Sequence, residues 1–151
     1  LEKQFDDANK QVLRIRCKYY HACVTVRELQ DEEEVHDIEG SILYFNAEKT
    51  SSWQDAQRWM NVIDRAGIPL RLLVCHRIPP ESHLFYQMAV EKQFELIELN
   101  PNPDDIEEGE EFGVRRIKSA LEAHLWPNME LLGKHCCHTP EVVSADHIGG
   151  G

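Results

Sequence analysis

Two short apolar runs with an amphipathic stretch between them form the clearest pattern in the chain. Residues 41–46 and 70–75 are almost continuously apolar, without the alternation expected of a strand that has one wet face. Such runs are typical of a parallel sheet covered on both sides. The apolar positions of residues 52–66, between them, repeat at helical spacing: Ala56, Trp59, Met60, Ile63 and Ala66. The pattern therefore predicts a βαβ unit and an α/β fold.

The ends of this helix also have sequence signals. Ser51 or Ser52 can accept a hydrogen bond from a free amide of the first turn, and Gly67 followed by Pro69 is typical of a helix end.

The remaining pattern predicts a hairpin, two more helices and another strand. Strands are expected at residues 11–17 and 19–28, paired antiparallel, and at 94–99; helices are expected at 83–93 and 113–126. Residues 1–10 are interpreted as a helix end or a frayed arm. Apolar positions at helical spacing predict the buried sets of the two helices: Leu84, Phe85, Met88 and Ala89, then Val114, Ile117, Ala120, Leu121, His124 and Leu125.

Charge and composition narrow the choice of partners. The 27 acidic and 16 basic residues give a formal net charge of −11, which opposes binding to nucleic acid or to anionic membranes. No apolar run approaches the roughly 20 residues that cross a bilayer, so direct membrane insertion is not expected. The first residues do not have the pattern of a signal peptide. Five cysteines without a disulfide-like framework are typical of a cytosolic protein.

Three groups of residues are candidates for catalysis or metal binding. Cys75 and His76 follow an apolar strand, where open α/β sheets place ligands, but neighbours on a strand point to opposite faces. Cys17, His21 and Cys23 share a strand face but lack the tight turn usual in zinc sites. Four consecutive residues, 135–138, can scarcely all ligate one ion. Structural roles are favoured for all three, with a cysteine or metal enzyme kept as an alternative.

Two strongly acidic stretches, residues 31–39 and 104–111, are interpreted as solvated segments. The alternative for the second is a docking strip for a basic partner, which it would attract over a long range. Its candidate partner-binding residues are Glu107, Glu108, Glu110 and Glu111. The tetrapeptide at 37–40 matches the Asp-x-x-Gly of GTP-binding proteins, but it precedes a strand instead of following one, so we treat it as coincidence.

Several short strings occur in a familiar order. They are Lys18-Tyr-Tyr20, Leu72-Leu-Val-Cys75 with Arg77, Phe94-Glu-Leu-Ile-Glu-Leu99 followed by Pro101, the acidic loop, and Gly113-Val-Arg-Arg-Ile117 through Ala120-Leu121 to Trp126. With this order and spacing, the chain resembles the alpha- and gamma-adaptin-binding protein family over about residues 18–128.

The resemblance implies a Rab-like small-GTPase-type fold with three layers, a mostly parallel sheet and helices on both faces. It also implies a catalytically degenerate pseudo-GTPase, not an enzyme and without a cofactor, that holds adaptin subunits and assists clathrin adaptor assembly in vesicle-mediated transport. The residues agree with degeneracy: no Gly-x-x-x-x-Gly-Lys-Ser/Thr occurs, and residues 75–78 stand where a guanine-reading Asn-Lys-x-Asp would follow the fifth strand. The alternative is a nucleotide-binding protein whose phosphate loop lies outside this chain.

The resemblance also predicts a gap in the sheet. A small GTPase places its first strand between the third and fourth, and no counterpart precedes residue 11. Without this strand, two buried edges would lie open. Either another segment fills the place, or the strand that fills it lies outside this chain. We expect residues 1–128 to form the α/β domain without its first strand and residues 129–151 to form a flexible tail. Homo-oligomerisation is possible in such a family.

Overall fold

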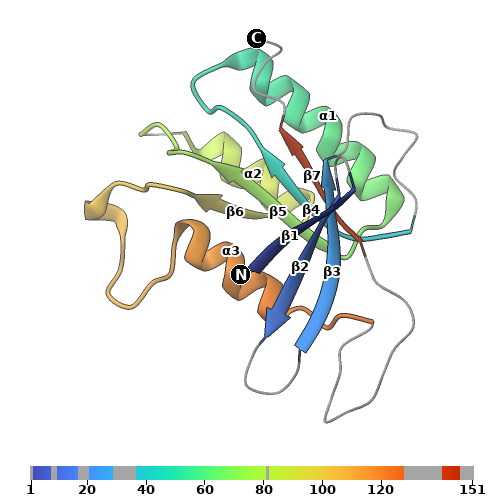
Figure 1. Ribbon diagram of the computed structural model, residues 1–151. Helices are drawn as coiled ribbons and strands as arrows, with labels where there is room; N and C mark the ends of the chain where they lie inside the picture. Colours follow the sequence, from blue (N-terminus) through green and yellow to red (C-terminus); the bar gives the residue numbers. More distant parts are fainter. Residues whose placement is uncertain are drawn as a thin grey trace.

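The computed structural model describes residues 2–7, 10–16, 21–28, 37–80, 82–127 and 141–146. Their strands form one seven-stranded sheet of order β1-β2-β3-β7-β4-β5-β6 (Figure 1). The strands are β1 (Glu2–Asp7), β2 (Lys10–Arg16), β3 (His21–Glu28), β4 (Ile38–Tyr44), β5 (Leu70–Cys75), β6 (Glu95–Glu98) and β7 (Glu141–Asp146). The first two pairs along the sheet are antiparallel, and the other four are parallel. The expected hairpin of β2 and β3 is confirmed.

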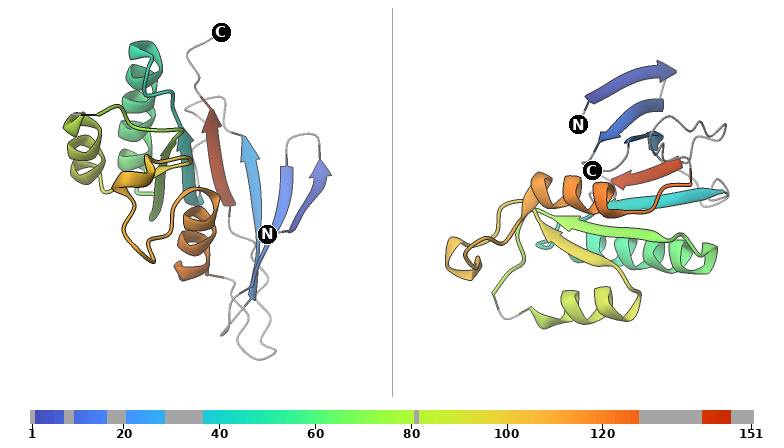
Figure 2. Two further views of the ribbon diagram at one scale, coloured as in Figure 1. Left: turned by 90° about the vertical axis from the view of Figure 1, so that its left-hand side faces the viewer. Right: turned by 90° about the horizontal axis from the view of Figure 1, so that it is seen from below.

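Helices cover both faces of this sheet. Helices α1 (Thr50–Ala66) and α2 (His83–Glu91) lie on one face, and α3 (Gly113–Ala123) lies on the other (Figure 2). The first core contains Trp59 of α1, Phe85 of α2 and Leu73 of β5. The second joins Leu121 and Trp126, in and after α3, to β2, β3 and β7. The predicted α/β class, with a mostly parallel sheet between two helical layers, is confirmed.

Helix α1 has the predicted buried stripe but a different start. Ala56, Trp59, Met60 and Ile63 are buried, whereas Ala66 is exposed. The residue before the first turn is Lys49, not Ser51 or Ser52, and no side chain caps it. The Ser52 hydroxyl instead accepts a hydrogen bond from the Asn46 amide (2.8 Å), which connects the helix to the end of β4. Gly67 ends the helix at φ 69° in the left-handed region, as predicted.

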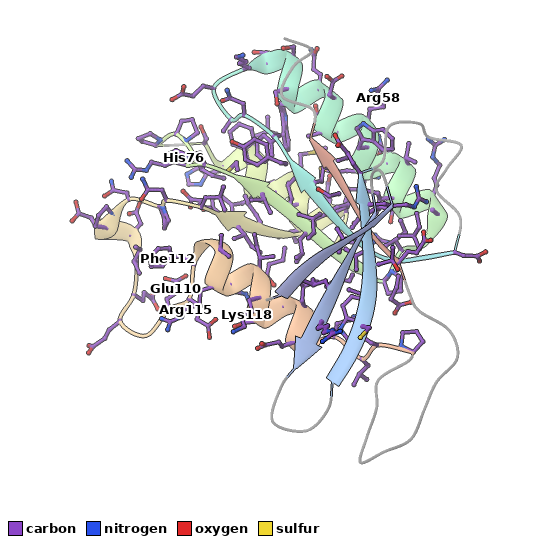
Figure 3. The ribbon with its side chains drawn as sticks, viewed as in Figure 1. Arg58, His76, Glu110, Phe112, Arg115 and Lys118 are labelled. Atoms are coloured by element: carbon purple, nitrogen blue, oxygen red, sulfur yellow. The ribbon has the colours of Figure 1, made fainter. Side chains whose placement is uncertain are left out.

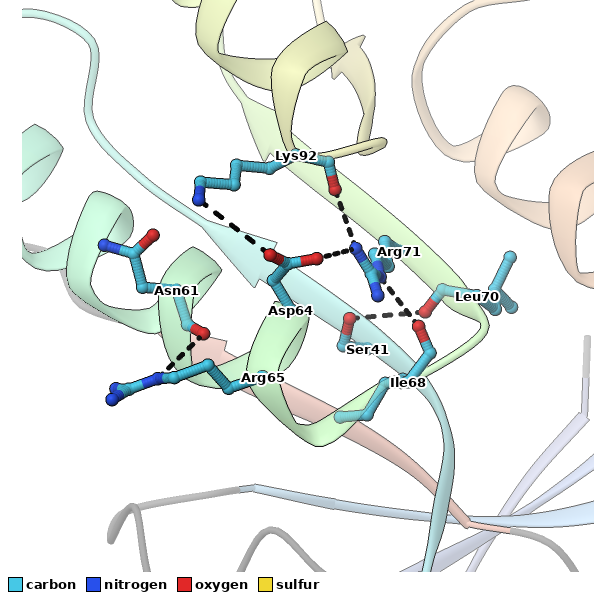
Figure 4. A network of polar contacts seen from close by, with 8 residues as sticks. All are labelled: Ser41, Asn61, Asp64, Arg65, Ile68, Leu70, Arg71 and Lys92. Atoms are coloured by element: carbon cyan, nitrogen blue, oxygen red, sulfur yellow. Dashed lines mark hydrogen bonds and ion pairs between the residues drawn. The ribbon is translucent and has the colours of Figure 1, made fainter.

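An arginine on β5 connects the two helices of this face to the sheet. Arg71 Nη1 donates to Asp64 Oδ1 at the end of α1 (2.7 Å) and to the Lys92 carbonyl after α2 (2.8 Å), and Nε donates to the Ile68 carbonyl (2.7 Å) (Figure 4). The Arg71 side chain is 10% exposed, so these hydrogen bonds satisfy a largely buried charge.

The place between β3 and β4 is filled from the far end of the chain. Strand β7 pairs in parallel with β3 on one side and with β4 on the other, with Val143 opposite Arg27 and Ser41. Val142, Val143 and Ala145 are buried, Val142 in the core of α3 and the other two in the core of α1 and α2. The predicted flexible tail was therefore wrong for Glu141–Asp146. Of the two expectations for the gap, a segment that fills it is confirmed.

Other differences concern edges and short helices. Residues Glu2–Asp7, expected in a helix end or a frayed arm, form an edge strand antiparallel to β2. Leu84 and Val114, expected to be buried, are exposed because α2 and α3 contact the sheet through Phe85, Ala120 and Leu121. Leu125 is exposed because α3 ends at Ala123, before the predicted end at residue 126. The predicted solvated segment at 31–39 falls largely outside the described residues.

The central position of β7 predicts a stability difference between two identical substitutions. Val143→Ala removes two buried methyl groups and leaves a cavity, so we expect it to lower the free energy of unfolding by about 2 kcal/mol. That corresponds to roughly 4–8 °C in Tm for a chain of this size. Val114→Ala removes the same atoms from a side chain that is 68% exposed and should change Tm by less than about 2 °C. Equal effects, measured by thermal unfolding, would contradict the burial of β7.

Candidate functional site

The carboxyl end of β5 contains the candidate nucleophile Cys75. It is hydrogen-bonded to the segment that directly follows β6 in the same chain. The amides of Leu99 and Asn100 donate to the carbonyls of Cys75 and His76, both at 2.8 Å. Arg77 Nε then donates to the Asn100 carbonyl (2.7 Å). The strand ends of β5 and β6 are therefore held together by the chain's own hydrogen bonds.

Cys75 does not have the properties of an activated nucleophile. Its side chain is fully buried, and burial, with the Glu98 carboxylate nearby as a second cause, raises the pKa of the thiol to about 12. His76 is exposed on the other side of the strand end. Because a reactive cysteine needs a lowered pKa and access to solvent, the geometry favours a structural Cys75.

The metal candidates are not brought together within the part of the chain that the structure describes. No group of three or more His, Cys, Asp or Glu side chains there could hold an ion. Cys23 is exposed on β3, whereas Cys17 and residues 135–138 lie outside the described ranges. Glu39, from the Asp-x-x-Gly match, has Oε1 2.7 Å from His124 Nε2 and so links β4 to the end of α3.

The acidic loop after β6 has a defined local structure. It begins with a short 3-10 helix, Pro103–Asp105, whose start is capped by the Asn102 side chain accepting from the Asp104 amide (3.1 Å). Farther along, the Glu107 amide donates to the Glu110 carboxylate (3.0 Å), and the Ser119 hydroxyl donates to the Glu111 carboxylate. These hydrogen bonds fold the loop back toward the first turns of α3.

A groove of about 580 Å³ lies between this loop, β6 and the nearest side chain of α2. Its polar and charged lining includes Tyr86, Glu95, Glu98, Asp105, Glu110, Glu111 and Arg116. Its apolar lining includes Leu96, Ile97, Pro101, Ile106 and Phe112. The groove thus combines the outer edge of the sheet with parts of both helical layers.

Fixed ion pairs and hydrogen bonds set the chemistry of the groove. Arg116 binds Glu95 through two hydrogen bonds, of 2.5 and 2.7 Å, and this raises the pKa of the guanidinium further. The Tyr86 hydroxyl donates to Glu98 Oε1 (3.0 Å). Burial, and then this hydrogen bond, raises the pKa of Tyr86 to about 12. Arg116 and Tyr86 therefore stay protonated at neutral pH. The groove is acidic because carboxylates outnumber the one guanidinium in its lining.

Only part of the predicted partner-binding set reaches the groove. Glu110 and Glu111 line it, whereas Glu107 and Glu108 are exposed on the loop outside its lining. Glu110 and Phe112 lie on the same side of the molecule as the start of α3 (Figure 3). Sequence reasoning gave no site role to Tyr86, Phe112 or Arg116. Tyr86 and Phe112 belong to no motif, and Arg116 lies in the string Gly113-Val-Arg-Arg-Ile117, which indicated only the family resemblance.

Three curated proteins have similar sequences. The mouse (Mus musculus) and human (Homo sapiens) proteins are each 28% identical to this chain, over 123 and 124 residues, and the orangutan (Pongo abelii) protein is 27% identical over 123 residues. All are named alpha- and gamma-adaptin-binding protein p34. The predicted resemblance to this family is confirmed.

These matches cover 74% of this chain but only 39% of each relative's length, so the chain spans well under half of the proteins it matches. No protein-family model matches the chain, and no solved structure matches it. In the described ranges, no helix has the length and apolar character needed to span a membrane.

The burial of Cys75 predicts selective labelling of the native protein. At pH 8 a thiol with a pKa of about 12 is ionised to roughly one part in 10⁴, so iodoacetamide should leave Cys75 unmodified. The exposed Cys23 should react under the same conditions. Peptide mass spectrometry before and after unfolding in guanidinium chloride measures both sites. Labelling of native Cys75 as fast as Cys23 would contradict its structural role.

Proposed function

We propose that this domain is a non-enzymatic binding module for adaptin subunits that assists the assembly of clathrin adaptor complexes in the cytosol. The observation that carries this proposal is the similarity to alpha- and gamma-adaptin-binding protein p34 over 74% of the chain. An acidic groove beside β6, which pairs only with β5 among the described strands, supports it, since an exposed sheet edge is a common binding site for another polypeptide.

The strand ends support a binding role over nucleotide chemistry. In an open α/β sheet, ligands bind at the carboxyl ends of the strands. Here Arg77 and the backbone of residues 75 and 76 bond to Leu99 and Asn100 in the region where the resemblance places a guanine-reading motif. A guanine base would have to compete with these hydrogen bonds.

The position of β7 argues against the alternative that this is a nucleotide-binding protein whose phosphate loop lies outside this chain. A first strand and phosphate loop supplied from outside this chain would need the place between β3 and β4, and β7 occupies that place. Such a strand would have to displace buried Val142 and Val143. This requirement favours the pseudo-GTPase proposal. Self-association remains a prediction.

Binding of adaptins tests the proposal. Purified chain should bind α-adaptin or γ-adaptin with a Kd in the micromolar range or tighter, measured by isothermal titration calorimetry and by co-purification. An unrelated acidic protein of similar size is the control for non-specific attraction, because net charge alone increases association at low salt. Failure of both adaptins to bind would contradict the proposed function.

The same calorimeter tests the alternative. GTP and GDP, each with Mg²⁺, should give no heat of binding at concentrations at which micromolar affinity, about −8 kcal/mol, is readily measured. Saturable binding of either nucleotide would support the alternative and contradict the proposal that the domain is a pseudo-GTPase.

A further inference from the structure

Strand β6 is the outermost strand on its side of the sheet and pairs only with β5 among the described strands. In a parallel strand, alternate residues direct both backbone groups to the same neighbour. The Leu99 amide donates to Cys75 of β5, so Ile97 and Glu95 also face β5, whereas the backbone groups of Leu96 and Glu98 face outward. Within the described chain, the backbone hydrogen bonds of turns and loops include none to these two residues.

The groove runs beside this outward edge. Leu96 and Ile97 line it from β6, Tyr86 lies on the α2 side, and Phe112 lies at the start of α3. The Tyr86 and Phe112 side chains are 45% and 44% exposed, so each presents an aromatic surface to solvent. An unpaired strand edge between apolar side chains is the arrangement to which an extended peptide adds as a further strand.

The charges of the groove define what such a strand must carry. Five carboxylates line it, from Glu95, Glu98, Asp105, Glu110 and Glu111, against one guanidinium, that of Arg116. Arg116 is paired with Glu95, so the remaining lining is anionic. The exposed cations Arg115 and Lys118 of α3 are not part of the lining. A basic segment would therefore gain favourable interactions here, and an acidic one would be repelled.

We propose that an extended, basic segment of the partner protein adds to the outer edge of β6, with its backbone paired to Leu96 and Glu98. Successive side chains of an added strand point to opposite faces of the sheet. Side chains on the α2 face of the added strand would then lie near Tyr86 and Asp105, and those on the α3 face near Phe112, Glu110 and Glu111. Each face of the segment therefore needs both apolar and basic side chains. This inference rests on the proposed function, because it names the surface that grips the adaptin.

Paired charge variants of the full chain separate groove contacts from general attraction. Glu110→Gln with Glu111→Gln and Glu107→Gln with Glu108→Gln remove the same charge from the same loop, but only the first pair lines the groove. We expect the first pair to raise the Kd for adaptin about tenfold, mainly by faster dissociation, and the second to raise it less than about threefold. Surface plasmon resonance measures both rates, and thermal unfolding confirms that the variants are folded.

An aromatic variant tests the apolar part of the groove in the same assay. Phe112→Ala should raise the Kd about tenfold or more, whereas Val114→Ala, exposed on α3 outside the groove, should leave it nearly unchanged. In the complex, amide hydrogen exchange at Leu96 and Glu98 should slow relative to the free chain. If neither pair of charge variants nor Phe112→Ala weakens adaptin binding, the groove is not the binding surface. The proposed function would still stand.

A second experiment tests peptide binding in the groove independently of adaptin binding. The probe is a peptide of about ten residues in which pairs of lysines alternate with pairs of valines, so that both faces of an added strand carry both kinds of side chain. It is titrated into the ¹⁵N-labelled chain and followed by NMR. The expected result is saturable shifts centred on Leu96, Glu98 and Phe112 that are lost in the Glu110→Gln, Glu111→Gln variant. A glutamate–valine peptide of equal length should not bind. No lysine–valine binding, shifts centred on another surface, or equal binding of both peptides would overturn the inference.

Discussion

The structure depends on the filling of one central place in a parallel sheet. A strand between two parallel neighbours must provide hydrogen bonds along both edges and apolar side chains toward both faces, because water reaches neither. Glu141–Asp146 meets these requirements, with registered pairs to β3 and β4 and with Val142, Val143 and Ala145 divided between the two cores. Without it, β3 and β4 would each have an unpaired edge in the middle of the protein.

With β7 in the centre of the sheet, the groups available for binding lie at the outer edge, along β6. The carboxyl ends of β5 and β6, where α/β proteins usually bind small ligands, are bonded to each other through the backbone of residues 75, 76, 99 and 100. Cys75 lies beneath them as a buried, protonated thiol. The outer edge of β6 instead has backbone groups that no other described strand pairs with, next to an acidic groove. The scaffold thus favours contact with a polypeptide over contact with a nucleotide.

The sequence predicts best where the chain's own neighbours determine the outcome. Helix α1 follows from a buried stripe and from Gly67, which can adopt the left-handed conformation at its end. Strands β4 and β5 follow from their apolar runs. The family resemblance was also available from short strings in fixed order. The signals for α1, β4 and β5 are local, and the resemblance depends on the order of short strings along the chain; all of them were confirmed.

The remaining features depend on contacts between distant segments. Strand β7 has only six residues, and its partners lie about 100 positions away or more, so no local pattern distinguishes it from a tail. Leu84 and Val114 have helical spacing but face solvent, because short helices contact the sheet through few residues. The groove combines Tyr86, β6 and Phe112 from three elements, and charge counting alone identified only its acidic wall.

Residue-resolved hydrogen exchange of the free protein is the most direct test, because one experiment compares the amides of central β7 with the outward amides of β6. We expect the amides of Val142, Val143 and Ala145 to exchange as slowly as those in the middle of β4, near the limit set by global unfolding. The outward amides of Leu96 and Glu98 should exchange orders of magnitude faster. Rapid exchange throughout residues 141–146, or strong protection of Leu96 and Glu98 in the unbound chain, would contradict this expectation.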